Sequence, residues 1–589
     1  MRLMSWCALV LMGSACGRSV PDPPPTRPAQ LIPAALAYVT EPTPDVIVGA
    51  ADVSDGLPVV TTCPTLLTGS ERAHRVVGKA CGVVTVRGSY VIEEGSLSLE
   101  AGATLAFVDD GELVVGSSGP AKLLAHGTAA DPVTFTAAGD QLDGVWRGIK
   151  LRARASRSEL EHVHIDWAGQ PDDAALVIDG DDVVLDDVHV RGSRGMGVWL
   201  GKETLAGRLA GLSFERVAKA VVMLAPRAAG ALVDMRFGDG QHVEVSGGTI
   251  AGHVVWPAIG VPYVLAEVVR VESDGNQRAL LELAAGSEVH FGPLGFIEVG
   301  FTGAGRLETH GSAAQPVVIR ATSADPERAS RHKGLRIYTK GEAELDGLDI
   351  ADGGEDGAIY VQRGRLAMRG GAVRQSLVGV HLQKDATLTT LDGVVFSGCP
   401  VALDIAARHL GFVQPSNTFD DAALIAVSGS VVDGDVTWQP LGAPIVVSGD
   451  IALEGRATLT LAPGLSLRMR EAGRFLVGFE APATLTAIGT AEAPITLGDT
   501  RDEAESWGGM TFYSNTRDSH LAHVRLVSVD AELAAIDARE SSEVSFADVS
   551  CSRCSAPTLT WRCESKITQA NVTARDGTPA ATRAPEHCD

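Results

Sequence analysis

Apolar and polar residues alternate in short stretches along most of this chain. Leu97, Leu99 and Leu105 are apolar, for example, and Ser98 lies between the first two. An apolar residue at every second position is the pattern of a β-strand with one buried and one solvent-facing side. The stretches are only about four or five residues long, and turns that contain glycine separate them. The sequence therefore predicts many short strands and little helix.

The same order of strands and turns occurs three times. Gly102, Gly286 and Gly464 occupy one place in the three copies, and the residues 14, 25 and 30 positions later are Gly, Gly and Pro in every copy. Such constant spacings indicate that the backbone turns in the same way in each copy. Nine positions stay apolar throughout: Leu97, Leu281, Leu459; Leu99, Leu283, Leu461; Leu105, Val289, Leu467; Phe107, Phe291, Met469; Leu113, Ile297, Phe475; Val115, Val299, Val477; Leu123, Leu307, Leu485; Val133, Val317, Ile495; and Phe135, Ile319, Leu497.

A repeat much longer than a hairpin, with constant internal spacings, is typical of a stacked solenoid rather than of a sandwich or a barrel. The motifs of the first copy resemble bacterial right-handed parallel β-helix proteins of the pectate-lyase-like superfold. The resemblance rests on residues 99–107, 111–116, 124–135 and 146–149, and on a lead-in motif at 256–260 that recurs at 438–442. It implies an all-β, right-handed parallel β-helix built of three homologous blocks. The fold alone does not imply an activity, because this superfold carries many.

The repeats and the flanking composition divide the chain into six segments. We expect a signal peptide, a Pro-rich tether, three β-helix blocks and a C-terminal tail. Their predicted ranges are 1–15, 16–60, 61–253, 254–435, 436–575 and 576–589.

Composition agrees with a solenoid and limits the possible partners. The 589 residues include 66 glycines, and 45% are hydrophobic, which suits tight corners around an aliphatic interior. The formal net charge is -24, from 73 acidic and 49 basic residues. With no basic stripe to neutralise phosphates, we expect no nucleic acid partner. The excess charge is typical of the solvated exterior of a long monomer, and we expect a monomer.

The N-terminus has the features of an export signal. A positive start at Arg2 precedes an apolar centre at 9–12, and a small-residue stretch ends at Cys16. This segment resembles a bacterial lipoprotein signal, which implies that Cys16 becomes the lipid-bearing first residue. Gly13 departs from that pattern, because leucine is usual there. Ordinary cleavage after Ala15 is the alternative, and both routes lead out of the cytoplasm.

The residues after Cys16 predict a stalk. Eight prolines lie between Val20 and Ala50, so we expect an extended, unstructured tether. No long apolar run follows, and membrane attachment is expected through the lipid alone. By resemblance to lipoprotein sorting signals, Gly17 favours the outer membrane or cell surface. A periplasmic or secreted protein is the alternative.

Cysteine usage fits an oxidising compartment. Cys63 and Cys81 flank the segment that enters the first coil, and we predict a disulfide that caps this end of the solenoid. Four more cysteines lie near the other end, where three pairings are possible. These four are Cys551, Cys554, Cys563 and Cys588. A redox or zinc motif is the less favoured interpretation of Cys551 and Cys554, and Cys399 is expected to be a buried thiol.

Clustered carboxylates raise the possibility of an enzyme. Many β-helices that this chain resembles cleave acidic polysaccharides, with aspartates that bind calcium or act as acid and base beside a cationic side chain. The candidates are Asp179, Asp181, Asp182, Asp186 and Asp187, with Arg147 and Lys150, and a second group at Asp349, Asp352, Glu355 and Asp356. Aspartates are also the ordinary residues of coil corners. A Gly-His-Gly motif is missing, so we favour the structural interpretation and expect no cofactor, with calcium as the alternative.

Three further side chains could hold a metal ion. His162, His164 and Asp166 alternate, so we expect all three on the solvent-facing side of one strand, where such a set can bind a metal ion. Nothing else in the sequence converges on them, and exposed polar positions are the favoured interpretation.

We expect an exported, lipid-anchored surface protein with a structural or adhesive role. The side of a solenoid could bind a cell-envelope glycan or a surface protein through Trp199, Tyr338, Tyr360 and Tyr513. A polysaccharide lyase or glycoside hydrolase is the alternative, and it requires acidic and basic residues of neighbouring coils to meet in one groove.

Overall fold

The computed structural model describes residues 55–139, 146–205, 207–273, 275, 277–322, 333–470, 472–501, 505–575 and 582–583. The predicted signal peptide, Cys16, nearly all of the tether and Cys588 lie outside these residues. The chain divides into two units, Met1–Gly56 and Leu57–Asp589, and the second is described here by itself.

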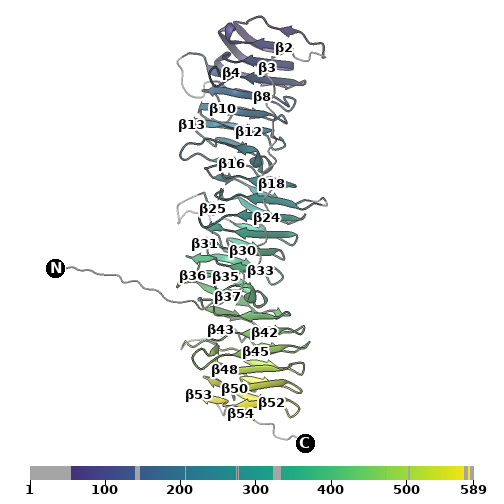
Figure 1. Cartoon of the computed structure of the whole chain (residues 1–589), viewed down its shortest axis with the longest axis vertical. Helices are drawn as coiled ribbons and strands as arrows, with labels where there is room; N and C mark the ends of the chain where they lie inside the picture. The colour runs from purple at the N-terminus through teal and green to yellow at the C-terminus, as the bar shows by residue number, and fades with distance from the viewer. Residues whose placement is uncertain are drawn as a thin grey trace, which may run out of the picture. The chain divides into compact units, whose positions relative to one another are not determined.

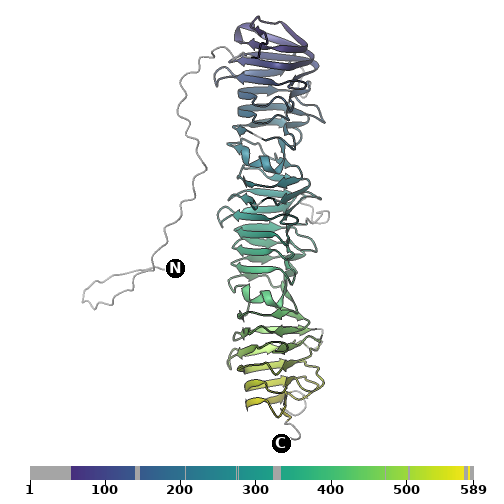
Figure 2. The same ribbon diagram turned by 90° about the vertical axis from the view of Figure 1, so that its right-hand side faces the viewer.

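This unit is a parallel β-solenoid of about 20 turns. Strands account for 54% of the residues and helix for 3%. Each strand pairs in parallel with the strand one turn later, as when β7 (Gly148–Leu151) pairs with β9 (Ala174–Ile178) and β9 with β11 (Met196–Leu200). Figures 1 and 2 show the strands stacked in sequence order from β2 (Leu66–Val77) to β52 (Lys566–Ala570). The predicted all-β parallel solenoid is confirmed.

One turn carries three strands on three faces. The turn formed by β5 (Ala121–His126), β6 (Val133–Ala137) and β7 is followed by a turn in which β8 (Glu159–Asp166) serves two faces. The first part of β8 pairs with β5 and its second part with β6. The bend falls at His162, whose φ is +49°. A left-handed residue within a strand turns the chain from one face to the next.

The interior consists of stacked apolar columns. All 27 residues at the nine repeated apolar positions are at most 1% exposed, as the alternation predicts. Four tryptophans, Trp146, Trp256, Trp438 and Trp507, are fully buried. The indole N–H of Trp146 donates to the carbonyl of Asp166 at 2.9 Å, and that of Trp507 to the carbonyl of Val527 at 3.0 Å. The indole N–H groups of these two tryptophans are thereby satisfied inside the core, whereas that of Trp438 is buried without a hydrogen-bond partner among the described residues.

The solenoid runs without interruption across the expected block boundaries. β16 (Val243–Val245) pairs with β19 (Tyr263–Leu265) across the first boundary. β37 (Leu424–Ser428) pairs with β40 (Ile445–Ser448) across the second. The lead-in segments near these points therefore form ordinary turns of one column.

The blocks begin on different faces of this column. Leu113 of the first block opens a line of directly paired residues that ends at Val289, the second-block counterpart of Leu105. The line passes through Ile149, Leu176, Val198, Val222, Val243 and Tyr263. A second line of directly paired residues begins at Ile297, the counterpart of Leu113 in the second block. It ends at Leu467, the counterpart of Leu105 in the third block. It passes through Leu335, Ile359, Val380, Leu403, Ile425 and Ile445.

Each block is thus turned by one face relative to the block before it. Equivalent surface residues of the three blocks point in three directions, and no single face collects them. The sequence repeats could not show this, because the rotation depends on how many strands fill each turn.

Disulfides lie at both ends of the described solenoid. Cys63 and Cys81 form the predicted bond, next to the short 3-10 helix η1 (Lys79–Cys81). Cys551 and Cys554 are joined to each other, and Cys563 is also disulfide-bonded. The Cys399 thiol is buried and lies 3.5 Å from the carbonyl oxygen of Val373.

Helix is confined to short 3-10 turns in the described part of the chain. Besides η1 these are η2 (Pro226–Ala231) and η3 (Ala407–Phe412). None of the helices described is long and apolar enough to cross a membrane.

We expect Leu307→Ala to lower the free energy of unfolding by about 2–4 kcal/mol, because it leaves a cavity in a close-packed column. Leu307 is fully buried, whereas Leu294 is 70% exposed. The matched change Leu294→Ala should alter stability by less than about 0.5 kcal/mol. Denaturant unfolding followed by circular dichroism measures both. Equal effects of the two changes would contradict the assignment of the core.

Candidate functional site

The first group of predicted acidic residues lies at a corner after β9. The Asp179 carboxylate is 3.2 Å from the Arg152 guanidinium. Asp181 accepts a hydrogen bond from the backbone N–H of Leu205 at 2.8 Å. Asp182 has a φ of +55°, which is the backbone of a tight corner. These side chains stabilise the turn between β9 and β10 (Val184–Ser193).

Asp186 and Asp187 lie at a different corner, where β10 bends. Asp187 has a φ of +55° and accepts a hydrogen bond from His162 at 2.8 Å. The Asp186 carboxylate is 3.6 Å from Arg208. The five aspartates are therefore divided between two corners, and the enzyme hypothesis loses its densest carboxylate group. Sequence proximity was misleading because a three-residue strand separates the two corners.

The two predicted cations do not join these aspartates. Lys150 is buried in β7, and its ammonium lies 3.0 Å from both Glu112 and Asp173. Arg147 is exposed at the start of the same segment. Lys150 therefore links neighbouring turns through its ion pairs with Glu112 and Asp173.

Three members of the second acidic group have partners within the solenoid, and the fourth, Glu355, is exposed. Asp349 is 3.1 Å from Arg320 and 3.2 Å from Arg374. Asp352 accepts the backbone N–H of Ala321, and Asp356 is 3.4 Å from Arg336. The pairs connect successive turns, which is a structural role.

The expectation that His162, His164 and Asp166 share one strand face is wrong. His162 is the left-handed residue at which β8 bends, so its side chain follows the corner and binds Asp187. His164 and Asp166 lie on the next face. Asp166 forms a two-point ion pair with Arg191, at 3.1 and 2.9 Å. A metal site made of all three residues would need a straight strand.

His164 lines a small hollow on this face of the first block. The rings of His164 and His189 meet edge to face at 5.0 Å. His189 is hydrogen-bonded to Ser213, which pairs with it from the next turn. The hollow has a volume of about 350 Å³ and is lined by His164, Asp166, His189, Val190, Arg191, Ser213, Phe214 and Glu215.

Two groups at or next to this hollow have shifted pKa values: His164, which lines it, and Asp187, which lies 3.5 Å from His189. Burial, together with the nearby charge of His189, lowers the pKa of His164. Burial by itself would raise the pKa of Asp187, but the hydrogen bond from His162 and the charges of His189 and Arg236 outweigh it, so this pKa is lowered. Asp187 is ionised near pH 7, where its hydrogen bond and the nearby cations favour the carboxylate, and His164 is neutral there chiefly because burial disfavours its charged form.

Exposed aromatic residues form a second kind of feature, on the second block. Phe301 is 55% exposed, and its ring meets that of Tyr338 edge to face at 4.9 Å. Tyr338 comes from the next turn, after β26 (Leu335–Ile337). Burial raises the pKa of Tyr338, so its phenol is a neutral hydrogen-bond donor.

The third block carries the same pair. Phe479 is 54% exposed and meets Tyr513 edge to face at 4.8 Å. The two phenylalanines follow equivalent repeat glycines, Gly300 and Gly478. Tyr513 follows β47 (Met510–Phe512), the counterpart of β26. An exposed aromatic pair is thus kept at one repeat position in two blocks.

A carboxylate from the preceding turn holds each phenylalanine loop. Glu272 accepts backbone N–H bonds from Thr302 at 2.7 Å and Gly303 at 3.3 Å. Burial would raise the pKa of Glu272, but these bonds outweigh it and lower the pKa. Glu454 accepts in the same way from the backbone of Glu480 and Ala481, at 3.1 and 2.5 Å. The loops that present the rings are therefore fixed by charge-assisted bonds.

The glycine before Phe301 has a steric cause. Gly300 has a φ of +71°, and a Cβ there would lie 2.0 Å from the backbone nitrogen of Gly341. Only glycine fits where two turns approach this closely. The corner therefore places Phe301 at the outer surface.

Polar groups surround both pairs. The Lys340 ammonium donates to the carbonyl of Thr302 at 2.6 Å, below the Phe301 loop. The Arg539 guanidinium lies over the Tyr513 ring, 4.7 Å from its centroid. Each pair therefore combines an apolar face with nearby hydrogen-bond donors.

The other two predicted aromatics are less available. Tyr360 lies beneath Arg336, 4.9 Å from its ring centroid, and its hydroxyl accepts from Gln383 at 2.6 Å. Trp199 is half-buried within β11. Phe301 and Phe479 were missed by the sequence reasoning, although Phe follows the same repeat glycine in both blocks. That coincidence was the available signal.

No protein family and no curated protein matches the chain. The functional conclusion therefore rests on the chemistry and placement of its side chains.

We expect His164 to make stability fall with acidification. Its folded-state pKa lies below the ordinary value of 6.5, so its contribution is complete above pH 6.5 and is lost as the pH falls through the folded-state pKa. Thermal unfolding of His164→Asn between about pH 7.5 and pH 5 should show a shallower loss than the native protein. His310→Asn, at a more exposed histidine, is the control. Identical pH profiles for all three proteins would contradict this prediction.

Proposed function

We propose that this protein is an exported, lipid-anchored surface protein whose solenoid binds glycan chains through the pairs Phe301–Tyr338 and Phe479–Tyr513. The observation that carries the proposal is the recurrence of an exposed, edge-to-face aromatic pair at one repeat position in two blocks. Both loops are held by a carboxylate of the preceding turn.

The chemistry of the pairs suits a sugar ring. An exposed phenylalanine ring is unfavourable in water, so a ligand that covers it gains free energy of binding. One or two rings offer too little area for a stable protein–protein interface. A pyranose presents C–H groups on its faces and hydroxyls at its edge. The rings of Phe301 and Tyr338 supply an apolar surface for the sugar face. The phenol of Tyr338 and the ammonium of Lys340 supply hydrogen-bond donors for the sugar hydroxyls.

The two pairs are separated along the column and turned around it. Seven parallel strand pairings lead from Leu335, near Tyr338, to Leu497 in the turn of Tyr513. At the usual spacing this is on the order of 35 Å. β26 and β47 also belong to different sheets. A long polysaccharide, or two chains of a network, can reach both pairs, and linked weak sites gain affinity from one another.

The N-terminal segment supports a place outside the cytoplasm. The lipoprotein-like signal ending at Cys16 and the Pro-rich stretch after it suit a protein that is tethered to the outer membrane. Disulfides at both ends of the solenoid suit an oxidising compartment. The repeat motifs favour a right-handed solenoid of the pectate-lyase-like kind.

Glycan binding is tested by retention on a panel of insoluble and arrayed envelope polysaccharides. We expect Phe301→Ala with Tyr338→Ala to weaken binding about tenfold, since a stacked ring contributes about 1 kcal/mol or more. The same changes at Phe479 and Tyr513 should act similarly, and loss of both pairs should abolish retention. The control is Phe412→Ala, which alters a phenylalanine that is 38% exposed. Retention that survives loss of both pairs would refute the proposal.

Lipid anchoring is tested separately in cells of a bacterium that processes lipoproteins. We expect Cys16→Ala to move the protein from the membrane to the soluble fraction, because the acyl chains are the only proposed anchor. Cys7→Ala should leave it in the membrane, since Cys7 lies within the removed signal. Mass spectrometry of the mature N-terminus identifies the lipid. A Cys16→Ala protein that stays in the membrane fraction would contradict this part of the proposal.

A further inference from the structure

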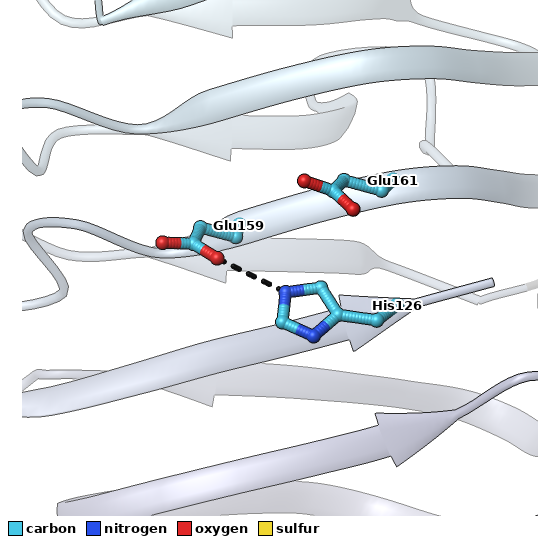
Figure 3. A group of neighbouring side chains, drawn as sticks. All are labelled: His126, Glu159 and Glu161. Carbon is cyan, nitrogen blue, oxygen red and sulfur yellow. Dashed lines mark hydrogen bonds and ion pairs between the residues drawn. The ribbon is translucent and has the colours of Figure 1, made fainter. Parts of the chain in front are cut away.

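Three metal-ligating side chains converge on the outer face of the first block. Figure 3 shows His126 on β5 pointing toward Glu159 and Glu161, which lie on the neighbouring strand β8. The Nε2 atom of His126 is 3.0 Å from a carboxylate oxygen of Glu159. One ligand atom from each residue lies within 4.8 Å of the other two. The histidine and glutamate side chains are about two-fifths exposed, at 42% and 43%, so ions in solution can reach them.

The strand register produces this group. His126 pairs directly with Glu161, and Leu124 pairs with Glu159. Since side chains two apart on a strand share a face, the two glutamates flank the imidazole from the next turn. Figure 3 also shows both carboxylates on the same side of β8. The backbone therefore preorganises three ligands on two consecutive turns.

The local charge favours a cation. Glu100 pairs with His126 from the preceding turn, and Asp186 pairs with Glu161 from the following one. Three carboxylates thus share one outer column with the imidazole of His126, and Glu159 lies beside it. Of the four carboxylates, Asp186 is near Arg208, at 3.6 Å. Across the described part of the chain, no lysine or arginine forms an ion pair with Glu159 or Glu161. Glu159 therefore has His126 as its ion-pair partner in place of a lysine or arginine, and Glu161 lies beside both.

In the second block, arginine side chains neutralise the equivalent carboxylates. The counterparts of the three residues are His310, Glu344 and Asp346. There Arg306 lies 3.0 Å from Glu344, and Arg369 lies 3.6 Å from Asp346. The first block has Lys122 in place of Arg306 and Asp186 in place of Arg369.

A second histidine group in that block is neutralised as well. His310 lies near Glu282 and Glu308. Arg306 is 2.5 Å from Glu308, and His253 contacts Glu282. Arginine thus occupies the position where a metal ion would compensate these carboxylates.

The third block has lost the ligands. Its counterparts of His126 and Glu161 are Ile488 and Ala522, and His520 replaces Glu159. Only the first block therefore combines a complete ligand set with the absence of an arginine partner in the described residues. The same fold accepts all three versions, so the ligands are not required for folding.

We propose that His126, Glu159 and Glu161 form a binding site for a divalent transition-metal ion, with zinc as the ion it fits best. Imidazole nitrogen with carboxylate oxygens is a ligand set of zinc, whereas calcium takes oxygen ligands alone. The ion binds Nε2 of His126 in place of its hydrogen bond to Glu159, with the ring proton on Nδ1, and exposed side chains supply the small rotations that bring Glu161 into contact. It joins β5 to β8 and leaves a fourth position for water or for an outside ligand.

The test is titration of the purified full-length protein with Zn²⁺, by calorimetry and by competition with a chromophoric chelator. We expect one ion per chain with a Kd in the micromolar range. Replacement of Zn²⁺ by Co²⁺ should give the visible absorption of a low-coordinate site. Added Zn²⁺ should also raise the melting temperature, because it binds only the folded state.

The third block supplies replacements that the fold tolerates. We expect His126→Ile, and Glu161→Ala, to weaken binding of Zn²⁺ at least a hundredfold and to remove its effect on melting. His310→Ile is the matched control, and it should leave the affinity within about twofold. Circular dichroism without metal verifies that each variant is folded.

Two results would overturn the proposal. One is the absence of any stoichiometric Zn²⁺ binding by the native protein. The other is binding that His126→Ile leaves unchanged, or that His310→Ile reduces to the same degree, because the ion would then occupy another site. Neither result bears on the aromatic pairs, which are tested with glycans.

Discussion

The structure depends on parallel pairing of each strand with the strand one turn later. This pairing satisfies the backbone and places each inward side chain on an apolar neighbour, as in the column from Leu113 to Val289. The same register aligns the outward side chains. Charged residues of successive turns therefore meet, and most of them pair locally, as Arg270 does with Glu298 at 2.9 Å. Ion pairs between successive turns therefore cover much of the outer surface.

Two surface features differ from this network of ion pairs: the exposed aromatic pairs and the carboxylates beside His126. The rings of Phe301 and Phe479 each meet one tyrosine and are more than half exposed, although hydrogen bonds hold their loops in place. The carboxylates beside His126 lack the arginines that neutralise their second-block counterparts. Buried or paired groups explain the fold, whereas fixed but unsatisfied groups at a surface indicate a partner. The rotation of each block by one face then directs equivalent features to different sides of the column.

Particular residues show how far sequence reasoning reached. Apolar alternation identified the core, and all 27 repeated apolar positions are buried. Tyr338 and Tyr513 were named as binding residues, but Phe301 and Phe479 were not, because cross-turn contacts are invisible in a linear pattern. In the linear sequence the aspartates between 179 and 187 form one group. A corner at Asp182 and another at Asp187 separate them. Alternation likewise predicts one strand face for His162, His164 and Asp166, because a linear pattern does not show the bend at His162.

The sequence by itself determined the strand period, the turns and the threefold repeat, because these depend on local alternation and on glycines at fixed spacings. It also determined which cysteines close the first end. The tertiary structure decided which residues of different turns meet. Loop lengths between strands vary, so only the folded register brings His126 beside Glu159 and Glu161, and Phe301 beside Tyr338. It also decided that successive blocks face different directions, since the number of strands in a block is not a whole number of turns.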